Sequence, residues 1–197
     1  MLRAYKYRLY PNSEQKEYFA KTFGCSRLIY NLMLADRIKS YEENKDLDIK
    51  KIKYPTPAQY KKKYEFLKEV DSLALANEQI NLDKAYKNFF RDKSVGFPKF
   101  KSKKTNYHSY TTNNQKGTVY IKNGYIKLPK LKSMVRIKQH RQIEGTIKSC
   151  TISKTPSNRY YISILAETEI EKLEPIEKKI GIDVGLKEFA ICSDGFR

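Results

Sequence analysis

The chain has 197 residues, 40% of them hydrophobic and 13% aromatic, and its 40 Lys and Arg against 22 Asp and Glu give a formal net charge of +18. That length favours one large domain or two to three small ones, and the hydrophobic content argues against disorder of the whole chain. Three cysteines, far apart and never in C-x-x-C spacing, exclude a disulfide framework and a complete four-cysteine zinc ribbon.

The first predicted element is a strand over residues 2–10, where basic and apolar side chains alternate. Asn12 followed three residues later by Gln15 is typical of a capping box, so we expect a helix to begin there. Gly24 is expected to interrupt or bend this helix. A second helical stretch over 26–41 carries apolar residues at helical spacing, which predicts a core-facing side.

Residues 42–53 are charged and are expected to form a loop. The next helix is expected to start with Thr56 as its N-cap and Pro57 at its first position. Asp71 or Ser72 should cap the helix after that. The apolar stripe of that last helix has heptad-like spacing, which favours an inter-helix seam over a ligand-binding box; its residues are Leu75, Leu82, Tyr86 and Phe89.

From about residue 93 the pattern changes to that of strands. Asn123-Gly124 separates two short alternating runs, and Asn-Gly supplies the positive φ angles that a type I′ hairpin requires. A strand over 134–138 and a hairpin of 147–154 with 160–166 follow. These elements predict an antiparallel sheet or small barrel, which the strand over 2–10 can join. A charged connector then leads to one more strand, at 179–184.

The positive charge is concentrated in residues 84–159. Nineteen basic and two acidic side chains lie there, so this block carries +17 of the total of +18. A solvated surface normally mixes charges of both signs, so this block indicates a surface that binds a polyanion.

The connector at residues 96–104 alternates basic and aromatic residues across a Gly/Pro turn. Aromatic rings can stack on bases while ammonium groups hold phosphates, so within the basic block we favour nucleic-acid binding over a plain solvated charge run. The candidate residues are Lys99, Phe100, Lys101, Lys103 and Lys104.

Further candidates lie outside the connector. The basic positions of the first strand are Arg3, Lys6 and Arg8. The amides Asn77, Gln79 and Asn81 can read adenine edges, although for any one of them an exposed, non-binding position is the favoured interpretation. Four tyrosines could stack on bases, and we expect at least half of them to be sheet core instead: Tyr107, Tyr110, Tyr120 and Tyr125. His108 and His140 lack metal-ligand spacing and are assigned no role.

Asp183 lies in an apolar strand between Gly181 and Gly185, which leave room for a ligand or metal to approach its carboxylate. The pattern has three interpretations. Asp183 is a metal ligand of a nuclease with an RNase H-like fold, part of a sugar-kinase-type ATPase, or only a turn residue in a hairpin. The kinase needs hydroxyl residues after the second glycine, where Leu186-Lys187 stand.

Five segments of the chain form a recognisable series. In chain order they are Leu2–Asn12, Phe23–Arg27 with Tyr30-Asn31, Asn81–Phe90, Phe97–Lys101 and Gly181–Lys187. Together they resemble the OrfB/TnpB family of insertion-sequence proteins, and the last segment is similar to the first RuvC motif of that family. The resemblance runs along the whole chain.

The resemblance implies an α+β fold. It comprises a split wedge-type antiparallel β-barrel, formed by 1–11 and 93–170, with a helical recognition domain inserted at 12–92. A linker at 171–178 leads to 179–197, which is expected to begin an RNase H-like (RuvC) nuclease domain.

The resemblance also implies a function. Family members are RNA-guided DNA endonucleases similar to type V CRISPR effectors, whose wedge and recognition parts hold the guide RNA and read target-adjacent DNA. The implied partners are therefore guide RNA and double-stranded DNA. Asp183 would be the first catalytic, metal-binding carboxylate, with Mg²⁺ as the metal.

The nuclease site of the family also needs a Glu and a second Asp, and its zinc ribbon needs cysteine pairs. All lie far downstream of the first motif, whereas this sequence extends 14 residues past Asp183. We therefore expect a truncated chain that lacks the zinc ribbon and does not cleave DNA alone. The alternative is a binding-only RNA or DNA module that represses or competes with intact copies.

Two exclusions concern location. No run approaches 18 apolar residues, so no membrane span is expected. The first residues alternate polar and apolar and have no signal-peptide h-region. We expect a cytoplasmic protein associated with the bacterial nucleoid.

Overall fold

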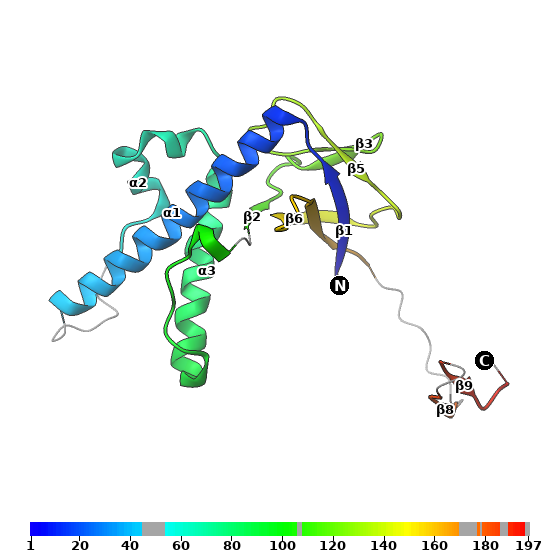
Figure 1. Cartoon of the computed structure of the whole chain (residues 1–197). Helices are drawn as coiled ribbons and strands as arrows, with labels where there is room; N and C mark the ends of the chain where they lie inside the picture. The colour runs from blue at the N-terminus through cyan, green and yellow to red at the C-terminus, as the bar shows by residue number, and fades with distance from the viewer. Residues whose placement is uncertain (45–53, 106–107, 170–176, 178, 186–188, 196–197) are drawn as a thin grey trace.

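The computed structural model describes residues 1–44, 54–105, 108–169, 177, 179–185 and 189–195, and its fold is α+β, as predicted. A curled antiparallel sheet has seven strands in the order β2-β6-β7-β1-β5-β4-β3. The α-helices of the described chain gather on one side of this sheet (Figure 1).

The N-terminal strand β1 (Leu2–Tyr10) lies in the middle of the sheet. It pairs along most of its length with β7 (Tyr160–Glu167) and near its end with β5 (Val135–Lys138). The prediction that the first strand joins the later ones is therefore confirmed. Successive side chains of a strand point to opposite faces, and in β1 the buried face carries Tyr5, Tyr7 and Leu9.

Both predicted hairpins are present. β3 (Tyr120–Lys122) and β4 (Tyr125–Lys127) are joined by Asn123 and Gly124, whose φ angles of 51° and 76° are those of the expected tight turn. The second hairpin joins β7 to β6 (Thr146–Lys154), and this pair carries a bulge between Ile147 and Ser149.

Strand β2 (His108–Asn113) was not predicted. It pairs antiparallel with β6 and places Tyr110 and Thr112 in the interior. Tyr110 is the one large apolar residue of the six, so the alternation of hydrophobicity is too weak to indicate a strand. Hydrogen bonding to the longer strand β6 therefore stabilises β2, although the local sequence pattern does not predict it.

Helix α1 (Ser13–Glu43) begins at the predicted capping box. Gln15 N–H donates to Asn12 Oδ1 (2.9 Å), and Asn12 N–H donates to Gln15 Oε1 (3.0 Å). The predicted interruption at Gly24 was wrong, because the helix continues without a break. A glycine inside a helix costs only about 1 kcal/mol, and buried Phe23 and Cys25 on either side of Gly24 offset that cost by packing.

Helix α2 (Pro57–Lys63) begins with Thr56 as its N-cap, as predicted, and is followed by the 3₁₀ turn η2 (Glu65–Lys68). Asp71 caps α3 (Ser72–Arg91), accepting from Leu73 N–H at 3.0 Å. Two short 3₁₀ turns follow, η3 (Lys93–Val95) and η4 (Lys103–Thr105). The predicted loop over 42–53 begins after Glu43, and 45–53 lie outside the described residues.

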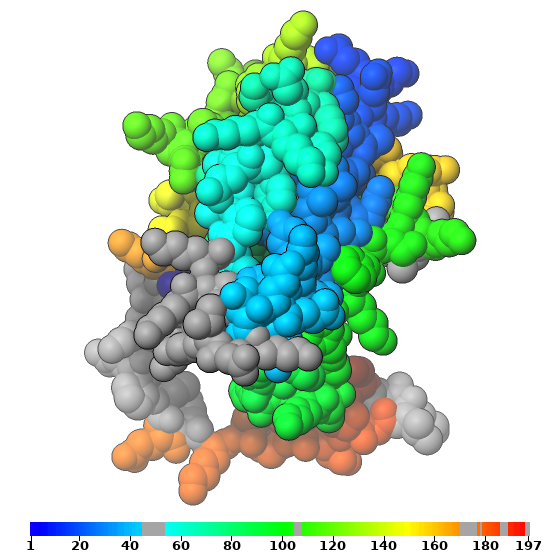
Figure 2. Space-filling model, turned by 90° about the vertical axis from the view of Figure 1, so that its left-hand side faces the viewer, coloured from blue at the N-terminus to red at the C-terminus, as the bar shows by residue number. Residues whose placement is uncertain are grey.

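The interior forms two clusters. One lies between the sheet and the N-terminal half of α1, where Phe19 and Phe23 are buried. The other lies among α1, α2, η2 and α3, and includes Ile29, Leu34 and Leu75. Figure 2 shows the face on which α2 and η2 cover α1. Helix α1 is therefore shared by both clusters.

The last described elements are two short strands, β8 (Ile182–Asp183) and β9 (Ile191–Cys192), which pair with each other. The strand predicted over 179–184 is thus only two residues long. Of the predicted linker at 171–178, only Glu177 is described, and Leu186-Lys187 lie outside the described residues.

Candidate nucleic-acid interface

The outer face of the sheet carries cations that lie against exposed tyrosine rings. On β1 this face holds Lys6, Arg8 and Tyr10, which alternate with the buried residues. The strand register sets Arg8 opposite Tyr161 of β7 and Lys138 of β5, and Tyr10 opposite Arg136. We call this set the sheet platform: Lys6, Arg8, Tyr10, Arg136, Lys138 and Tyr161.

Contacts within the sheet platform join guanidinium groups to rings. Arg8 donates to Tyr161 Oη (3.2 Å), and its guanidinium lies 5.1 Å from the Tyr161 ring centre and 5.7 Å from that of Tyr10. Arg136 lies 5.7 Å from the Tyr10 ring, and the Lys6 ammonium 5.1 Å from that of Tyr161. The tyrosine rings are neutral, so these contacts do not compensate the positive charges of Lys6, Arg8 and Arg136.

The electrostatics of the outer face are strongly positive. The hydrogen bond and charge of Arg8 lower the pKa of the Tyr161 hydroxyl below its ordinary value. Glu167, an acidic side chain at the far end of the same face, is paired with Lys148 at 2.7 Å. Tyr125, 46% exposed and opposite Arg136, extends the aromatic surface.

Arg3 does not share this face with Lys6 and Arg8. Strand alternation places it on the side of Tyr5 and Tyr7, where it forms an ion pair with Glu144. Hydrogen bonding to Tyr5 and the charge of Glu144 raise the pKa of its guanidinium. The structure thus separates the three basic residues that sequence reasoning grouped on β1.

One lysine of the connector is paired with a buried carboxylate. The Lys101 ammonium is 2.6 Å from the carboxylate of Glu78, which is only 2% exposed, and lies 4.2 Å from the Tyr30 ring centre. Asn31 accepts from Lys101 N–H (2.8 Å) and donates to its carbonyl (3.0 Å). These contacts join Tyr30 and Asn31 to Lys101, and so bring together two of the five segments on which the family resemblance rests.

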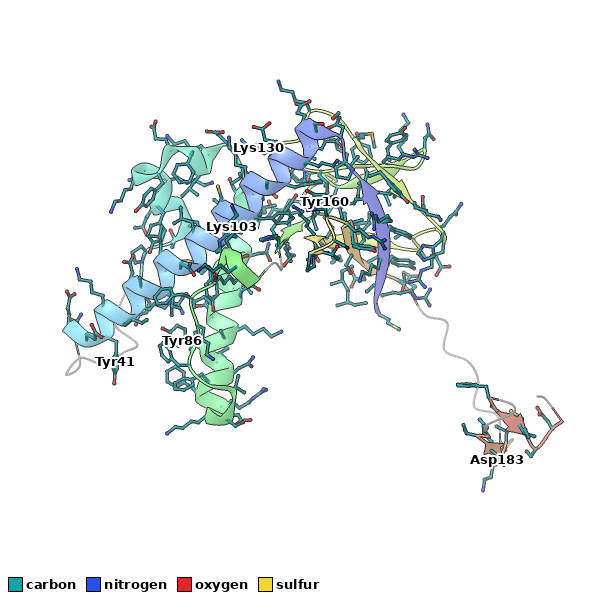
Figure 3. The ribbon with its side chains drawn as sticks, in the orientation of Figure 1. Tyr41, Tyr86, Lys103, Lys130, Tyr160 and Asp183 are labelled. Atoms are coloured by element: carbon teal, nitrogen blue, oxygen red, sulfur yellow. The ribbon has the colours of Figure 1, made fainter. Side chains whose placement is uncertain are left out.

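The other connector candidates are exposed. Lys99, Phe100, Lys103 and Lys104 all face solvent, and Phe100 is 56% exposed. Figure 3 marks Lys103 on this segment. The connector therefore combines one anchored lysine with three accessible ones.

A small cleft opens beside the connector, which we call the His108 cleft. It has a volume of about 270 Å³, and its walls include Arg27, Phe100, Ser102 and His108. The His108 ring stacks on Phe23 with ring centres 5.9 Å apart. Burial, followed by the positive charges of Arg27, Lys154 and Lys103, lowers the pKa of His108.

The amide candidates lie on α3 but not on one face. Positions 77 and 79 are about 200° apart around a helix of 3.6 residues per turn. Asn77 donates to the Leu73 carbonyl of its own helix (2.8 Å), and both side chains are half-buried. Of the four tyrosine candidates, Tyr110 is buried, Tyr120 and Tyr125 are exposed, and Tyr107 lies outside the described residues.

Asp183 is exposed on the β8–β9 hairpin, away from the sheet platform (Figure 3). Among the described residues, no three His, Cys, Asp or Glu side chains come together as a metal site. One exposed carboxylate does not fit a site for two Mg²⁺ ions, which requires shared carboxylates. The hairpin also exposes apolar side chains, with Val184 at 71% and Phe189 at 91%.

Sequence reasoning missed several residues of this surface. Tyr161, Arg136 and Lys138 were not candidates, although alternation within 160–163 and Val135–Lys138 points these side chains outward once the strands are assigned.

None of the helices in the described part of the chain is long and apolar enough to cross a membrane.

Comparison with known proteins gives consistent matches. Residues 1–46 match the family model HTH_OrfB_IS605, described as a helix-turn-helix domain. In the structure, residues 1–44 of this region contain β1 and α1.

Three relatives show how far the similarity extends. A candidate RNA-guided DNA endonuclease of Streptomyces pristinaespiralis is 31% identical over 199 residues, and the candidate RNA-guided DNA endonuclease InsQ of Escherichia coli K12 is 32% identical over 201 residues. Each alignment covers 98% of this chain and 48% of the relative, so the chain spans about half their length. The virulence protein VsdF of Salmonella dublin is 39% identical over 113 residues, which are 52% of this chain and 95% of that protein.

Proposed function

Because the chain belongs to the OrfB/TnpB family, we propose that it is a nucleic-acid-binding protein of the RNA-guided DNA endonuclease type, with guide RNA and double-stranded DNA as partners. The observation that carries the proposal is the sheet platform, where cations lie against tyrosine rings on an exposed face. Such a surface offers charge to phosphates and rings to bases.

The order of the elements supports the family's domain plan. β1 lies in the centre of a sheet whose other six strands come from residues 108–167, and α1, α2 and α3 arise between them. We therefore assign 1–11 and 93–170 to a split wedge-type β-barrel and 12–92 to an inserted recognition domain. Residues 179–197, which include Asp183, would begin a RuvC-type nuclease domain.

We assign the two nucleic acids to different surfaces. The sheet platform, with Lys6 and Arg8, would hold folded guide RNA, because its rings and cations cover a broad curved face. The half-buried amides Asn77 and Gln79 on α3, together with the exposed connector lysines, would lie near target-adjacent DNA. Lys101 would act by anchoring the connector to Glu78, and Arg3 by its pairing with Glu144.

The first experiment measures binding. The purified 197-residue chain, freed of bound nucleic acid by nuclease treatment, is titrated with structured RNA and with duplex DNA at 50 and 200 mM salt. Four phosphate contacts would give a slope of log K against log salt of roughly −3 to −4. A chain that binds neither polymer in a salt-dependent manner refutes the proposal.

The second experiment tests cleavage. Asp183 is the proposed first metal-binding carboxylate, but the described residues form no group of three possible metal ligands around it, so we expect this chain with Mg²⁺ and guide RNA to leave a target plasmid intact. Cutting that is abolished by Asp183→Ala would show that a functional site assembles after all.

A second candidate function is that of a binding-only module. It is favoured by the position of the cationic surfaces, all of which lie within residues 1–169, while Asp183 lies outside them. Such a module would compete with full-length relatives for the same RNA. Addition of the chain to a cleavage reaction by a full-length relative separates the two, since a competitor lowers that cleavage in proportion to its concentration.

A further inference from the structure

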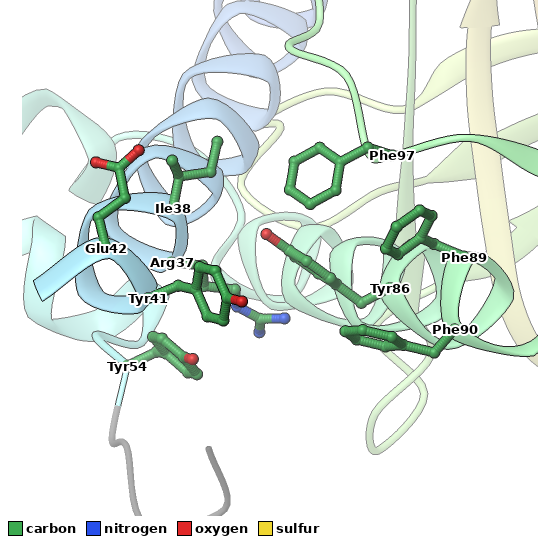
Figure 4. A pocket seen from close by; sticks show the side chains of 9 residues that line it. All are labelled: Arg37, Ile38, Tyr41, Glu42, Tyr54, Tyr86, Phe89, Phe90 and Phe97. Carbon is green, nitrogen blue, oxygen red and sulfur yellow. The ribbon is translucent and has the colours of Figure 1, made fainter. Parts of the chain in front are cut away.

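Two cavities lie against helix α1, and their walls differ in charge. The larger, about 620 Å³, lies between the C-terminal ends of α1 and α3 and is lined mainly by aromatic rings (Figure 4). Its cation, Arg37, already forms an ion pair, and the Glu42 carboxylate adds a negative charge to the wall. The smaller is the His108 cleft, where the one acid among the described lining residues, Glu78, is paired with Lys101. An anion is therefore expected in the His108 cleft and not in the larger cavity.

Separate segments of the chain meet at the His108 cleft. Phe23 and Arg27 lie one turn apart on α1, and the Phe23 ring stacks on the His108 ring with centres 5.9 Å apart. Strand register places Lys154 of β6 directly opposite His108 of β2, so these two side chains share a face of the sheet. The connector contributes Phe100 to the wall. The cleft is therefore built by a helix, two strands and the connector together, and not by a single loop.

Three cations in or beside the His108 cleft have no acidic partner within the described part of the chain. None of the ion pairs formed there includes Arg27, Lys103 or Lys154. Lys154 lies 5.8 Å from the centre of the Tyr160 ring, which is neutral and does not compensate its charge. The effect is felt at His108, where burial and then the charges of these three residues lower the pKa of the ring. A bound anion would relieve this repulsion.

The size and the donors of the cleft suit one phosphate group of a larger ligand. Its volume of about 270 Å³ is just below the range of small-ligand sites, roughly 300–1,000 Å³. Arg27 offers a planar fork of donors that matches phosphate oxygens, and His108 and Ser109 offer a ring N–H and a hydroxyl. Phe100, 56% exposed in the wall, can stack on a base next to that phosphate. Together these groups favour a phosphate that belongs to a nucleic-acid strand.

We propose that the His108 cleft binds a backbone phosphate of a nucleic-acid strand, with Arg27 paired to the phosphate oxygens and His108 and Ser109 donating to them. Lys103 and Lys154 add positive potential around the site. The inference rests on the proposed nucleic-acid function and adds a second site to it. This site lies on the side of β2 where Phe23 packs, whereas the sheet platform lies on the outer face. RNA and DNA carry the same phosphate, so the test includes both.

The first test measures the affinity of the full chain for a structured RNA and for a DNA duplex at several salt concentrations. Arg27→Gln removes the proposed phosphate ligand. Lys16→Gln is the matched control, because it removes the same charge from an exposed position of the same helix outside the cleft. Relative to this control, Arg27→Gln should weaken binding of at least one polymer about tenfold and reduce its salt slope by about 1. The polymer affected is the source of the phosphate.

The second test observes His108 in the wild type, so it does not depend on the folding of a variant. The chain has two histidines, and His140 lies outside the cleft, against Tyr7. NMR of the ring protons follows His108 with pH, and the His140 signals serve as the reference. The bound polymer should raise the pKa of His108, because a phosphate offsets the cations around it. Arg27→Lys, which keeps the charge, should retain this response, and Arg27→Gln should lose most of it.

Three results would overturn the proposal. One is equal affinity of Arg27→Gln and Lys16→Gln for both polymers. Another is an unchanged titration of His108 when the wild type binds nucleic acid. The third is an equal response of His108 to polyglutamate, which would assign the cleft to the carboxylates of an acidic protein. In all three cases the sheet platform can still bind, and the proposed function stands. If the wild type shows no salt-dependent binding at all, the proposed function fails as well.

Discussion

The sheet platform and the connector use similar residues in opposite ways. On the sheet platform, half-buried Arg8 lies against the rings of Tyr10 and Tyr161 and forms no ion pair within the described residues. On the connector, Lys101 lies against the ring of Tyr30 but is paired with the buried carboxylate of Glu78. A cation–π contact is therefore no guide to whether a cation is free to bind a ligand, since the second partner decides.

This difference separates residues that bind from residues that hold the fold. Loss of Arg8 removes a surface charge, whereas loss of Lys101 leaves a buried carboxylate without its counter-charge. Substitution of Lys101 should therefore lower the free energy of unfolding, whereas substitution of Arg8 should lower the affinity for nucleic acid.

The largest effect is expected for Lys101→Met. The Glu78 carboxylate is 2% exposed but the Lys101 side chain is 39% exposed, so removal of Lys101 should lower the free energy of unfolding by about 2 kcal/mol. Urea denaturation followed by circular dichroism measures this change. The matched control is Lys99→Met on the same connector, which is exposed and should change stability by less than about 0.5 kcal/mol. Equal stability of the two variants would contradict the anchoring role of Lys101.

The second prediction concerns affinity for RNA. Arg8→Gln should weaken binding about tenfold, the cost of one charged hydrogen bond, and reduce the salt slope by about 1. Fluorescence anisotropy at several salt concentrations measures both. Arg3→Gln is the control from the same strand, because Arg3 lies on the other face and is paired with Glu144. If Arg3→Gln weakens binding as much as Arg8→Gln, the RNA does not discriminate between the two faces.

The third prediction tests whether the edge of the sheet can be weakened without loss of binding. Gly124 has φ = 76° in the β3–β4 turn, a conformation that costs a residue with a Cβ about 1–2 kcal/mol. Gly124→Ala should therefore lower stability by about that amount. Affinity for RNA at 25 °C should stay within about twofold, since Arg8 and Tyr161 are unaffected. A parallel loss of affinity would mean that the hairpin residue Tyr125 is part of the binding surface.

Much of the fold follows from local pattern. The capping box at Asn12 and Gln15 and the turn at Asn123-Gly124 are satisfied by residues within four positions, so the sequence alone predicts them. Strand β2 is different. Its pairing with β6 joins residues 36 to 46 positions apart, and the bond from Thr112 Oγ1 to the Asp71 carboxylate joins residues 41 positions apart, so no local pattern encodes them.

The sequence predicted the kind of candidate site, a polyanion-binding surface, but not all of the residues that form it. Concentration of charge in residues 84–159 indicated a polyanion-binding surface, and alternation along the first strand selected Arg3, Lys6 and Arg8, of which only Lys6 and Arg8 lie on the outer face. Which cations are neutralised depends on partners far along the chain, such as Glu78 for Lys101 and Glu144 for Arg3. The cavity beside Tyr86 and Phe89 was missed because heptad-like spacing predicts both residues in the helix seam. Tyr86 does pack, half-buried, against that seam, but both rings also line the cavity.

The smallest effect is expected at the His108 cleft, which lies beside the connector. Burial and the charges of Arg27, Lys154 and Lys103 lower the pKa of His108 below its value in the unfolded chain, about 6.5. As the pH falls through 6.5, the unfolded chain takes up the proton first, so the folded state loses stability. The contribution is fully present above pH 6.5 and declines below it. The His108→Asn variant should lose less stability than the wild type between pH 7.5 and 5.5.

Affinity should change in the opposite direction. A phosphate in the His108 cleft would offset the charges of Arg27, Lys103 and Lys154 and so raise the pKa of His108 in the complex. Protonation then favours the complex, and RNA affinity should rise as the pH falls from 7.5 to 5.5 in the wild type but not in His108→Asn. Thermal melting measures the change in stability over this pH range, and fluorescence anisotropy measures the change in RNA affinity, for the wild type and the variant alike. Stability and affinity that fall together would show that the cations beside His108 are held by the fold, as Lys101 is, rather than left free for phosphate.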